Sequence, residues 1–239
     1  MNLARPHLLG LLAGLFLAAG LVFSALLVSR AWLQISESQT INATGSARRN
    51  VRSDLVLWRG SFSAEAETLL GAQSRLKEDL LKVEGFLKLN GITNFALTPI
   101  AIQELKSTDN TPKRLGFHLT QTVEINSTEV ERITKLARDS TALVEQGVFF
   151  TTVPPEYIYT KAGETKVEML AEATKDARSR AEQIVLQGGR RIHQLRSARM
   201  GVFQITPLYS TQTSSEGMND TSSLEKTVTA VVTTSFSLK

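Results

Sequence analysis

The chain has 239 residues, of which 42% are hydrophobic, with 27 Lys and Arg, 23 Asp and Glu and no cysteine. This composition excludes collagen-like, intrinsically disordered and disulfide-scaffold proteins. The absence of cysteine also excludes thiol catalysis and cysteine metal sites. Because the net charge is +4, and only +3 from Arg30 onward, we expect no nucleic-acid partner.

An apolar run occupies residues 8–28, where 17 of 21 residues are apolar and the others are three Gly and one Ser. As a helix this run is about 30 Å long, which matches the hydrocarbon core of a bilayer. No second run approaches the roughly 18 residues that another span needs. We therefore predict a cytoplasmic tip and transmembrane signal anchor over residues 1–33, a linker over 34–40 and an extracytoplasmic domain over 41–239.

The alternative to a retained anchor is a cleaved signal peptide. A cleaved signal has an apolar region of about 7–15 residues and a small-x-small site. In this chain the run is longer, and Ser29-Arg30-Ala31 is a poor version of that site. Arg5 and the amino terminus favour a cytoplasmic N-terminus, although Arg30 opposes this orientation. We predict a single-pass protein of the cytoplasmic membrane whose C-terminal domain lies in the periplasm or outside the cell.

Small residues recur at four-residue spacing within the apolar run, at Gly10, Gly14 and Ala18. Such a face lets two membrane helices approach closely. The alternative is that Gly and Ala are simply common in membrane helices. The interpretation favoured for the whole chain is a homo-oligomer, to which this face would contribute.

Beyond residue 40, strand and helix patterns alternate. Alternation from 55 to 64 predicts a half-buried strand after a first strand from Ile41. We then predict a helix over 65–90 and a hairpin of strands 95–106 and 115–125 with its turn at 107–112. A second helix runs from a Thr128/Glu131 capping box to Gly147 and is followed by strands 148–153 and 156–160. The remaining elements are a third helix over 164–187, an extended region 190–206, a mobile loop 210–223 and a last strand with Val228, Ala230, Val232 and Phe236 on one face. This order predicts an α+β fold of largely antiparallel sheet with three main helices.

The third helix has an alanine-rich face, which predicts close approach by a sheet or another helix. Its expected buried residues are Val167, Leu170, Ala171, Thr174, Ala177, Ala181, Ile184 and Val185. After it, four arginines occur within ten residues that contain no acid: Arg190, Arg191, Arg196 and Arg199. They suggest contact with lipid headgroups, an acidic envelope polymer or a neighbouring subunit. The alternative is an ordinary solvated strand whose charge is offset by acids of the third helix.

No catalytic, cofactor-binding or metal-binding residues are predicted. His7, His118 and His193 lack the clustered spacing of a metal site. Ser223-x-x-Lys226 has the spacing of some Ser/Lys hydrolases, but a strand would point the two side chains to opposite faces. Gly188-Gly189 follows a helix, which is the wrong polarity for a phosphate loop.

Three segments resemble the SIMPL-domain proteins of bacterial envelopes: Ala43-Thr44-Gly45-Ser46-Ala47 with Asp54-Leu55-Val56, Leu119 to Ile125, and Leu170 to Glu182 with Gly188-Gly189. Ser53 stands where the family usually has proline. The resemblance covers roughly residues 41–238. It implies export or anchoring by one N-terminal segment, ring-like oligomers in some members and a link to envelope stress in others. It carries over no catalytic residues.

The leading hypothesis is therefore a non-enzymatic, membrane-anchored envelope protein that self-assembles or scaffolds other envelope proteins. A second hypothesis is a binding module for a small hydrophobic or anionic envelope ligand, which a deep apolar pocket would favour. The third is the Ser/Lys hydrolase.

Overall fold

The computed structural model describes residues 6–36, 39–108, 113–212 and 214–239. It confirms the α+β prediction, with antiparallel sheets and one N-terminal apolar helix. The predicted domain 41–239 contains two compact units. Unit 1 comprises residues 1–46, 172–201 and 231–239, and unit 2 comprises residues 47–171 and 202–230.

Helices and strands follow one another along the chain from α1 at its start to β10 at its end. They are α1 (Pro6–Ser36), β1 (Thr40–Arg52), β2 (Leu55–Ala66), α2 (Leu69–Leu89), β3 (Ala96–Leu97), β4 (Ala101–Lys106), β5 (Arg114–Ser127), α3 (Val130–Asp139), α4 (Ala142–Glu145), β6 (Phe149–Thr152), β7 (Glu156–Ile158), α5 (Ala162–Gln187), β8 (Ile192–Met200), β9 (Gln204–Pro207) and β10 (Glu225–Leu238).

Helix α1 contains the apolar stretch Gly10–Trp32, whose 23 residues have a mean hydropathy of 2.6. This length is enough to cross a bilayer, as the sequence predicts. A single such helix near the N-terminus fits either a membrane anchor or a signal peptide. The predicted flanking charge Arg5 and two positions of the predicted linker, 37 and 38, lie outside the described residues.

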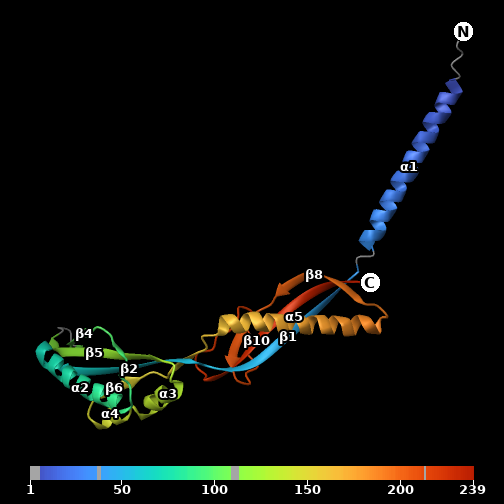
Figure 1. The fold of residues 1–239 in the computed structure, drawn as a ribbon. Coiled ribbons are helices and arrows are strands. Elements are labelled where there is room, and N and C mark those ends of the chain that lie inside the picture. The colour runs from blue at the N-terminus through green and yellow to red at the C-terminus, as the bar shows by residue number, and fades with distance from the viewer. Residues whose placement is uncertain (1–5, 37–38, 109–112, 213) are drawn as a thin grey trace. The chain divides into compact units, whose positions relative to one another are not determined.

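In the first sheet, β10 lies between β1 and β8, and β9 also pairs with β10 (Figure 1). The part of α5 that belongs to unit 1 packs closely against β1. A Cβ built on Gly45 would lie 2.2 Å from both the Ala173 carbonyl oxygen and the Ala177 nitrogen. The Ser46 N–H also donates to Asp176 Oδ2 at 2.8 Å. The alanine-rich face of the helix therefore permits backbone-to-backbone contact, as predicted.

The buried stripe of α5 is only partly the predicted one. Val167 and Ile184 are 71% and 59% exposed. The buried positions recur every four residues instead: Thr165, Met169, Ala173, Ala177, Ala181 and Val185. The prediction is confirmed at Ala177, Ala181 and Val185. It missed Ala173, although Gly45 meets the helix backbone at Ala173 and Ala177, where only small side chains allow such close approach.

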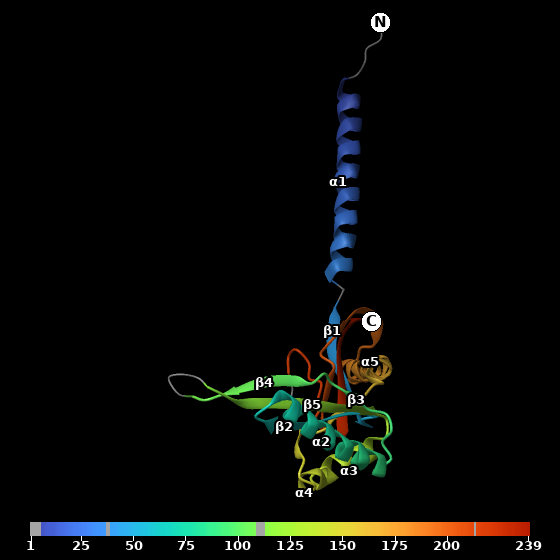
Figure 2. The same ribbon diagram turned by 90° about the vertical axis from the view of Figure 1, so that its left-hand side faces the viewer.

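In the second sheet, all within unit 2, the strand order is β3-β5-β2-β6, with β4 also pairing with β5 and β7 with β2. Helices α2 and α3 lie against one face of it (Figure 2). Even-numbered residues of β2 face these helices, and Val56, Trp58 and Phe62 are almost completely buried there. The alternation predicted for residues 55–64 is confirmed.

Other predicted boundaries shift for local reasons. The predicted strand 95–106 is divided into β3 and β4 around Pro99, which cannot donate a ladder hydrogen bond. Helix α2 begins later than predicted, because β2 continues to Ala66 and Thr68 accepts from the Gly71 N–H as the N-cap.

The predicted capping box at the start of the second helix is wrong. The N-cap of α3 is Glu129 and makes no side-chain cap bond, while Ser127 Oγ accepts from the Glu129 N–H. The helix then ends at Asp139 and a separate turn, α4, follows; Leu143 is buried there but Val144 is exposed. Turn positions 109–112 and loop position 213 lie outside the described residues.

Candidate functional site

Arg190 and Arg191 lie in the reversal that connects α5 to β8. The helix ends when the Arg190 N–H donates to the Val185 carbonyl at 3.0 Å and the Gly189 N–H donates to the Leu186 carbonyl at 3.0 Å. Gly189 has φ +69°, a left-handed conformation that glycine adopts without strain. The predicted Gly-Gly helix stop thus turns the two arginines back toward the sheet.

The same two arginines lie where β1 begins and β10 ends. The Arg190 guanidinium donates to the Gln39 side chain, and the Leu238 N–H donates to the Gln39 carbonyl at 3.0 Å. Arg191 and Lys239 exchange two backbone hydrogen bonds, of 3.1 and 2.8 Å. Three segments that are distant in sequence therefore meet at the arginines.

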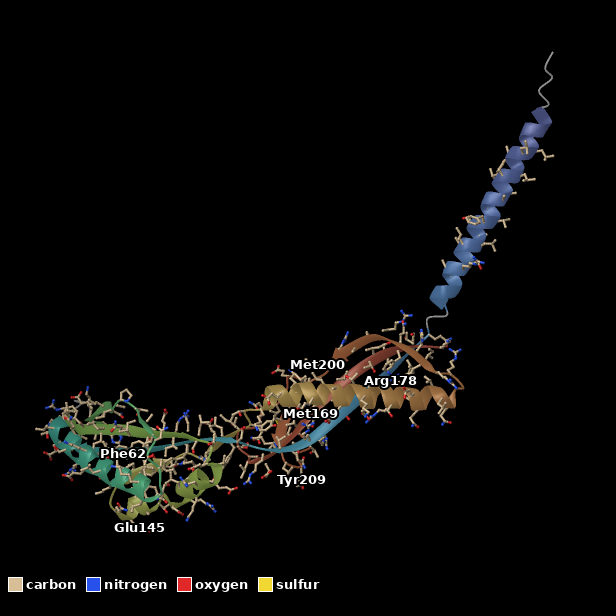
Figure 3. All side chains as sticks on the ribbon, in the orientation of Figure 1. Phe62, Glu145, Met169, Arg178, Met200 and Tyr209 are labelled. Atoms are coloured by element: carbon tan, nitrogen blue, oxygen red, sulfur yellow. The ribbon has the colours of Figure 1, made fainter. Side chains whose placement is uncertain are left out.

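Arg178, which Figure 3 labels on α5, lines the same surface hollow as Arg190 and Arg191. We call Arg178, Arg190 and Arg191 the basic end. They surround a surface hollow of about 370 Å³, which is also lined by Glu182, Gln183, Val185, Leu186 and Ile192. Arg178 pairs with Glu182 at 2.9 Å, whereas Arg190 and Arg191 form no ion pair with an Asp or Glu side chain in the described part of the chain, and the Arg191 N–H donates to Lys239 O at 3.1 Å. The hollow therefore combines Arg190 and Arg191, neither of which is paired with a described Asp or Glu side chain, with apolar surface from Val185, Leu186 and Ile192.

The other two arginines of the predicted patch lie elsewhere on β8. Arg196 falls at a bulge, because Ser197 pairs with Ser235 and Leu195 pairs with Phe236. Arg199 pairs with Thr233, eight residues beyond Arg191 and therefore about 26 Å along the strand. The structure thus keeps Arg190 and Arg191 together, separates Arg199 from them and adds Arg178, which sequence reasoning missed.

Strand β8 is an edge strand with an unusual degree of exposure. Eight of its nine residues are exposed and the ninth is half-buried. Leu195 and Met200 are 51% and 53% exposed. It pairs with β10 on one side, and no strand in the described part of the chain pairs with its other side. A row of backbone donors and acceptors is therefore available to another chain.

Ser223 and Lys226, the spacing-based hydrolase pair, both turn toward Asp220. Lys226 Nζ donates to the Asp220 carboxylate at 3.1 Å and to its carbonyl oxygen, and Ser223 also hydrogen-bonds that carboxylate. The Lys226 side chain is 0% exposed and that of Asp220 is 6% exposed. This geometry makes the ammonium an ion-pair partner rather than a base beside a hydroxyl.

The pKa values of this buried pair follow from the same contacts. Burial alone would raise the pKa of Asp220, but hydrogen bonds from Ser222, Lys226 and Ser223 outweigh it and lower the pKa to about 2. Burial lowers the pKa of Lys226, and the hydrogen bond and charge of Asp220 offset this only in part. The pair fastens the segment before β10 to the strand itself.

Histidines and carboxylates show no metal-binding arrangement in the parts of the chain that are described. His118 Nδ1 lies 2.8 Å from Glu65 Oε1, and His193 is exposed on β8. No group of three His, Asp or Glu side chains that could hold a metal ion occurs among the residues described.

Unit 2 has further surface hollows, including two of more than 400 Å³. One, of about 620 Å³, lies between residues 52–54 and the start of α3, and its arginines are paired: Arg52 with Glu131 and Glu225, and Arg132 with Glu129. The other, of about 440 Å³, is lined by Val153, Pro154, Pro155, Tyr157 and neighbouring residues of α3. Both are open surface hollows.

The predicted association face of α1 is exposed along its length, since Gly10, Gly14 and Ala18 have no covering residues in the described chain. A Cβ at Gly10 or Gly14 would meet nothing within 4 Å. Larger side chains therefore fit there within a single chain.

Comparison with known proteins identifies a family. The model of the SIMPL family, described as a protein of unknown function (DUF541), matches residues 41–236. No curated protein matches the chain.

Solved structures give only distant likenesses. A hydantoinase/carbamoylase-family amidase from Burkholderia phymatum is 8% identical at a TM-score of 0.31, over 53% of this chain and 35% of the amidase. A hydrolase from Listeria innocua is 9% identical at a TM-score of 0.22, over 80% of this chain and 91% of that one. This chain spans about a third of the amidase. Likenesses this weak carry no argument about function, whereas the family match covers most of the chain: the protein belongs to the SIMPL family.

Proposed function

We propose that this protein is a non-enzymatic, membrane-anchored scaffold whose domain associates with further copies of itself through the free edge of β8. The observation that carries the proposal is the edge itself, which is nine residues long, exposed and unpaired on one side within the described chain. Adding a strand to such an edge satisfies the backbone of both partners.

The helix α1 supports the anchoring part of the proposal. Its apolar stretch is long enough to span a bilayer and ends without a good cleavage site, so α1 stays attached as a signal anchor. The domain from residue 41 then lies in the periplasm or outside the cell. Membrane attachment confines the copies to two dimensions and raises their effective concentration, so that a short edge contact is sufficient.

A second contact is proposed within the membrane, along Gly10, Gly14 and Ala18. Small residues at this spacing let two helices approach closely, and nothing else in the described chain covers them. The family resemblance adds envelope stress protection as the physiological setting. Other envelope proteins are then the partners that the assembled domains would hold.

The test is the mass of the full-length protein in detergent, measured by light scattering. We expect an oligomer. The double variant Ala198→Lys with Met200→Lys places charge on the exposed edge and should reduce the mass, because lysines on an edge strand oppose strand addition. Its matched control is Leu89→Lys, at an apolar residue of α2 that is 89% exposed.

A second double variant tests the contact between membrane helices independently of the contact at the β8 edge. Gly10→Leu with Gly14→Leu fits the single chain without a clash and should reduce the mass only if the membrane helices associate. A monomeric wild-type protein would overturn the self-assembly proposal. An oligomer that survives both sets of substitutions would place its contact elsewhere.

A further inference from the structure

The basic end is tied by a short connection to the segment that enters the membrane. From Trp32, where the apolar stretch ends, helix α1 continues to Ser36, about 6 Å further. The chain then reaches Gln39 in three residues, at most about 10 Å. The lipid headgroup layer takes up roughly 6 Å of this distance. Gln39, which bonds Arg190, therefore lies no more than about one Debye length from the headgroups.

Charge is distributed unevenly between the two units, and unit 1, which contains the basic end, carries the positive balance. Residues 39–46, 172–201 and 231–239 of unit 1 contain eight Lys and Arg against three Asp and Glu, a balance of +5. Unit 2 has 17 Lys and Arg against 19 Asp and Glu, a balance of −2. The unit joined directly to the membrane helix is thus the one that an anionic surface attracts.

Asp176 and Glu182, two of the acids of unit 1, are paired with groups other than Arg190 and Arg191. Asp176 is held by the Ser46 N–H and by Arg180 at 2.9 Å, contacts that also keep its pKa below the usual value. Glu182 pairs with Arg178 at 2.9 Å. Arg190 and Arg191 are exposed residues, and planar guanidinium groups bind phosphate oxygens two at a time.

The hollow beside these arginines suits one end of a phospholipid. Its volume of about 370 Å³ is within the usual range for small-ligand sites. Leu186 is 64% exposed at its edge, and Val185 and Ile192 also line it. A phosphate on the arginines would therefore have apolar surface beside it for the glycerol and upper acyl carbons.

We propose that the basic end binds the headgroups of anionic phospholipids in the bilayer that holds α1, and so docks unit 1 onto the membrane surface. The proposal rests on the retained anchor proposed above. Attraction of basic residues by an anionic surface predicts that Arg190 and Arg191 together favour the docked form by about thirtyfold. Higher salt weakens this attraction, because the Debye length falls from about 10 Å at 0.1 M to about 3 Å at 1 M.

The experiment uses the full chain in lipid nanodiscs of phosphatidylcholine, with and without phosphatidylglycerol. Because the chain has no cysteine, a donor dye on Gln183→Cys, which lines the hollow, labels one position. Energy transfer to an acceptor on the lipid headgroups should rise when phosphatidylglycerol is present and fall again in high salt. Arg190→Gln with Arg191→Gln should abolish the rise.

The matched control is Arg196→Gln with Arg199→Gln, which removes the same charge from the same sequence region but outside the hollow. It should retain the rise. Equal transfer in both lipids, or equal loss in both double variants, would overturn docking by the basic end. Failure of the protein to co-purify with nanodiscs of either composition would instead count against the anchor. A response to a soluble acidic polymer but not to phosphatidylglycerol would assign the arginines to a different partner.

Discussion

The two units of the domain achieve packing in opposite ways. Unit 2 buries large side chains, with Trp58 and Phe150 rings 6.1 Å apart and Phe62 fully enclosed between sheet and helices. Unit 1 brings backbones together across Gly45, Ala173 and Ala177, where there is no room for a single added carbon. Unit 2 is therefore stabilised mainly by the burial of apolar surface. Unit 1 is stabilised by close packing of backbones, which requires very small side chains at the contact.

The largest expected effect concerns the buried pair in unit 2. Asp220→Asn leaves Lys226 buried without its counter-charge and should lower the free energy of unfolding by about 3–5 kcal/mol. Adding Lys226→Met to that variant removes the unpaired buried ammonium and should recover most of the lost free energy of unfolding. Urea unfolding curves of both variants test this. If the double variant is no more stable than the single one, the pair is not the cause.

The next effect tests the close contact in unit 1. Gly45→Ala should destabilise by about 3 kcal/mol, at the top of the usual range for overpacking, because its Cβ would collide with the backbone of α5. Hydrogen exchange should increase in residues 172–187 and 40–46 before it increases in unit 2. The control is Gly85→Ala in α2, where a Cβ meets nothing within 4 Å and the variant should gain roughly 0.5–1 kcal/mol. Equal effects at the two glycines would contradict the comparison.

A smaller effect should appear in acid. The pKa of Asp220 is about 2 in the folded protein against 3.8 for an unperturbed aspartate. A carboxylate with a depressed pKa stabilises the fold fully above about pH 4 and loses that contribution as the pH falls through about 2. The expected loss is about 2 kcal/mol. Measured across this range, the Asp220→Asn variant should lose less stability than the wild type; parallel curves would be inconsistent with this assignment.

Periodicity explains which parts of this fold could be predicted. The alternation of β2 and β10 and the length of α5 depend on local sequence, and Val228, Ala230, Val232 and Phe236 are buried as expected. The register of α5 against the sheet was only partly predicted, because it depends on Gly45, which is far away in sequence. The predicted cap of α3 at Thr128 was wrong because Ser127, one residue before it, accepts the local hydrogen bond from the Glu129 N–H.

The candidate site shows the same limit. Arg190 and Arg191 could be identified because they are adjacent and no acid is nearby in sequence. Their association with Arg178 and Gln39 depends on the chain reversal at Gly189 and on the meeting of β1 with β10. The Gly-Gly signal indicated a helix end but not which helix positions would face the returning strand. Burial of Lys226 was equally hidden, since a lysine in an amphipathic strand is normally solvated.

The bulge at Arg196 limits the length over which another strand can pair with the free edge of β8. Regular pairing with β10 extends only from Ser197 to Met200, and the register shifts on the other side of Ser197. A strand added along this edge would find matching donors and acceptors for about 13 Å before the geometry fails. An interface this short opposes the growth of fibres and favours reversible contacts between anchored molecules that diffuse in the bilayer.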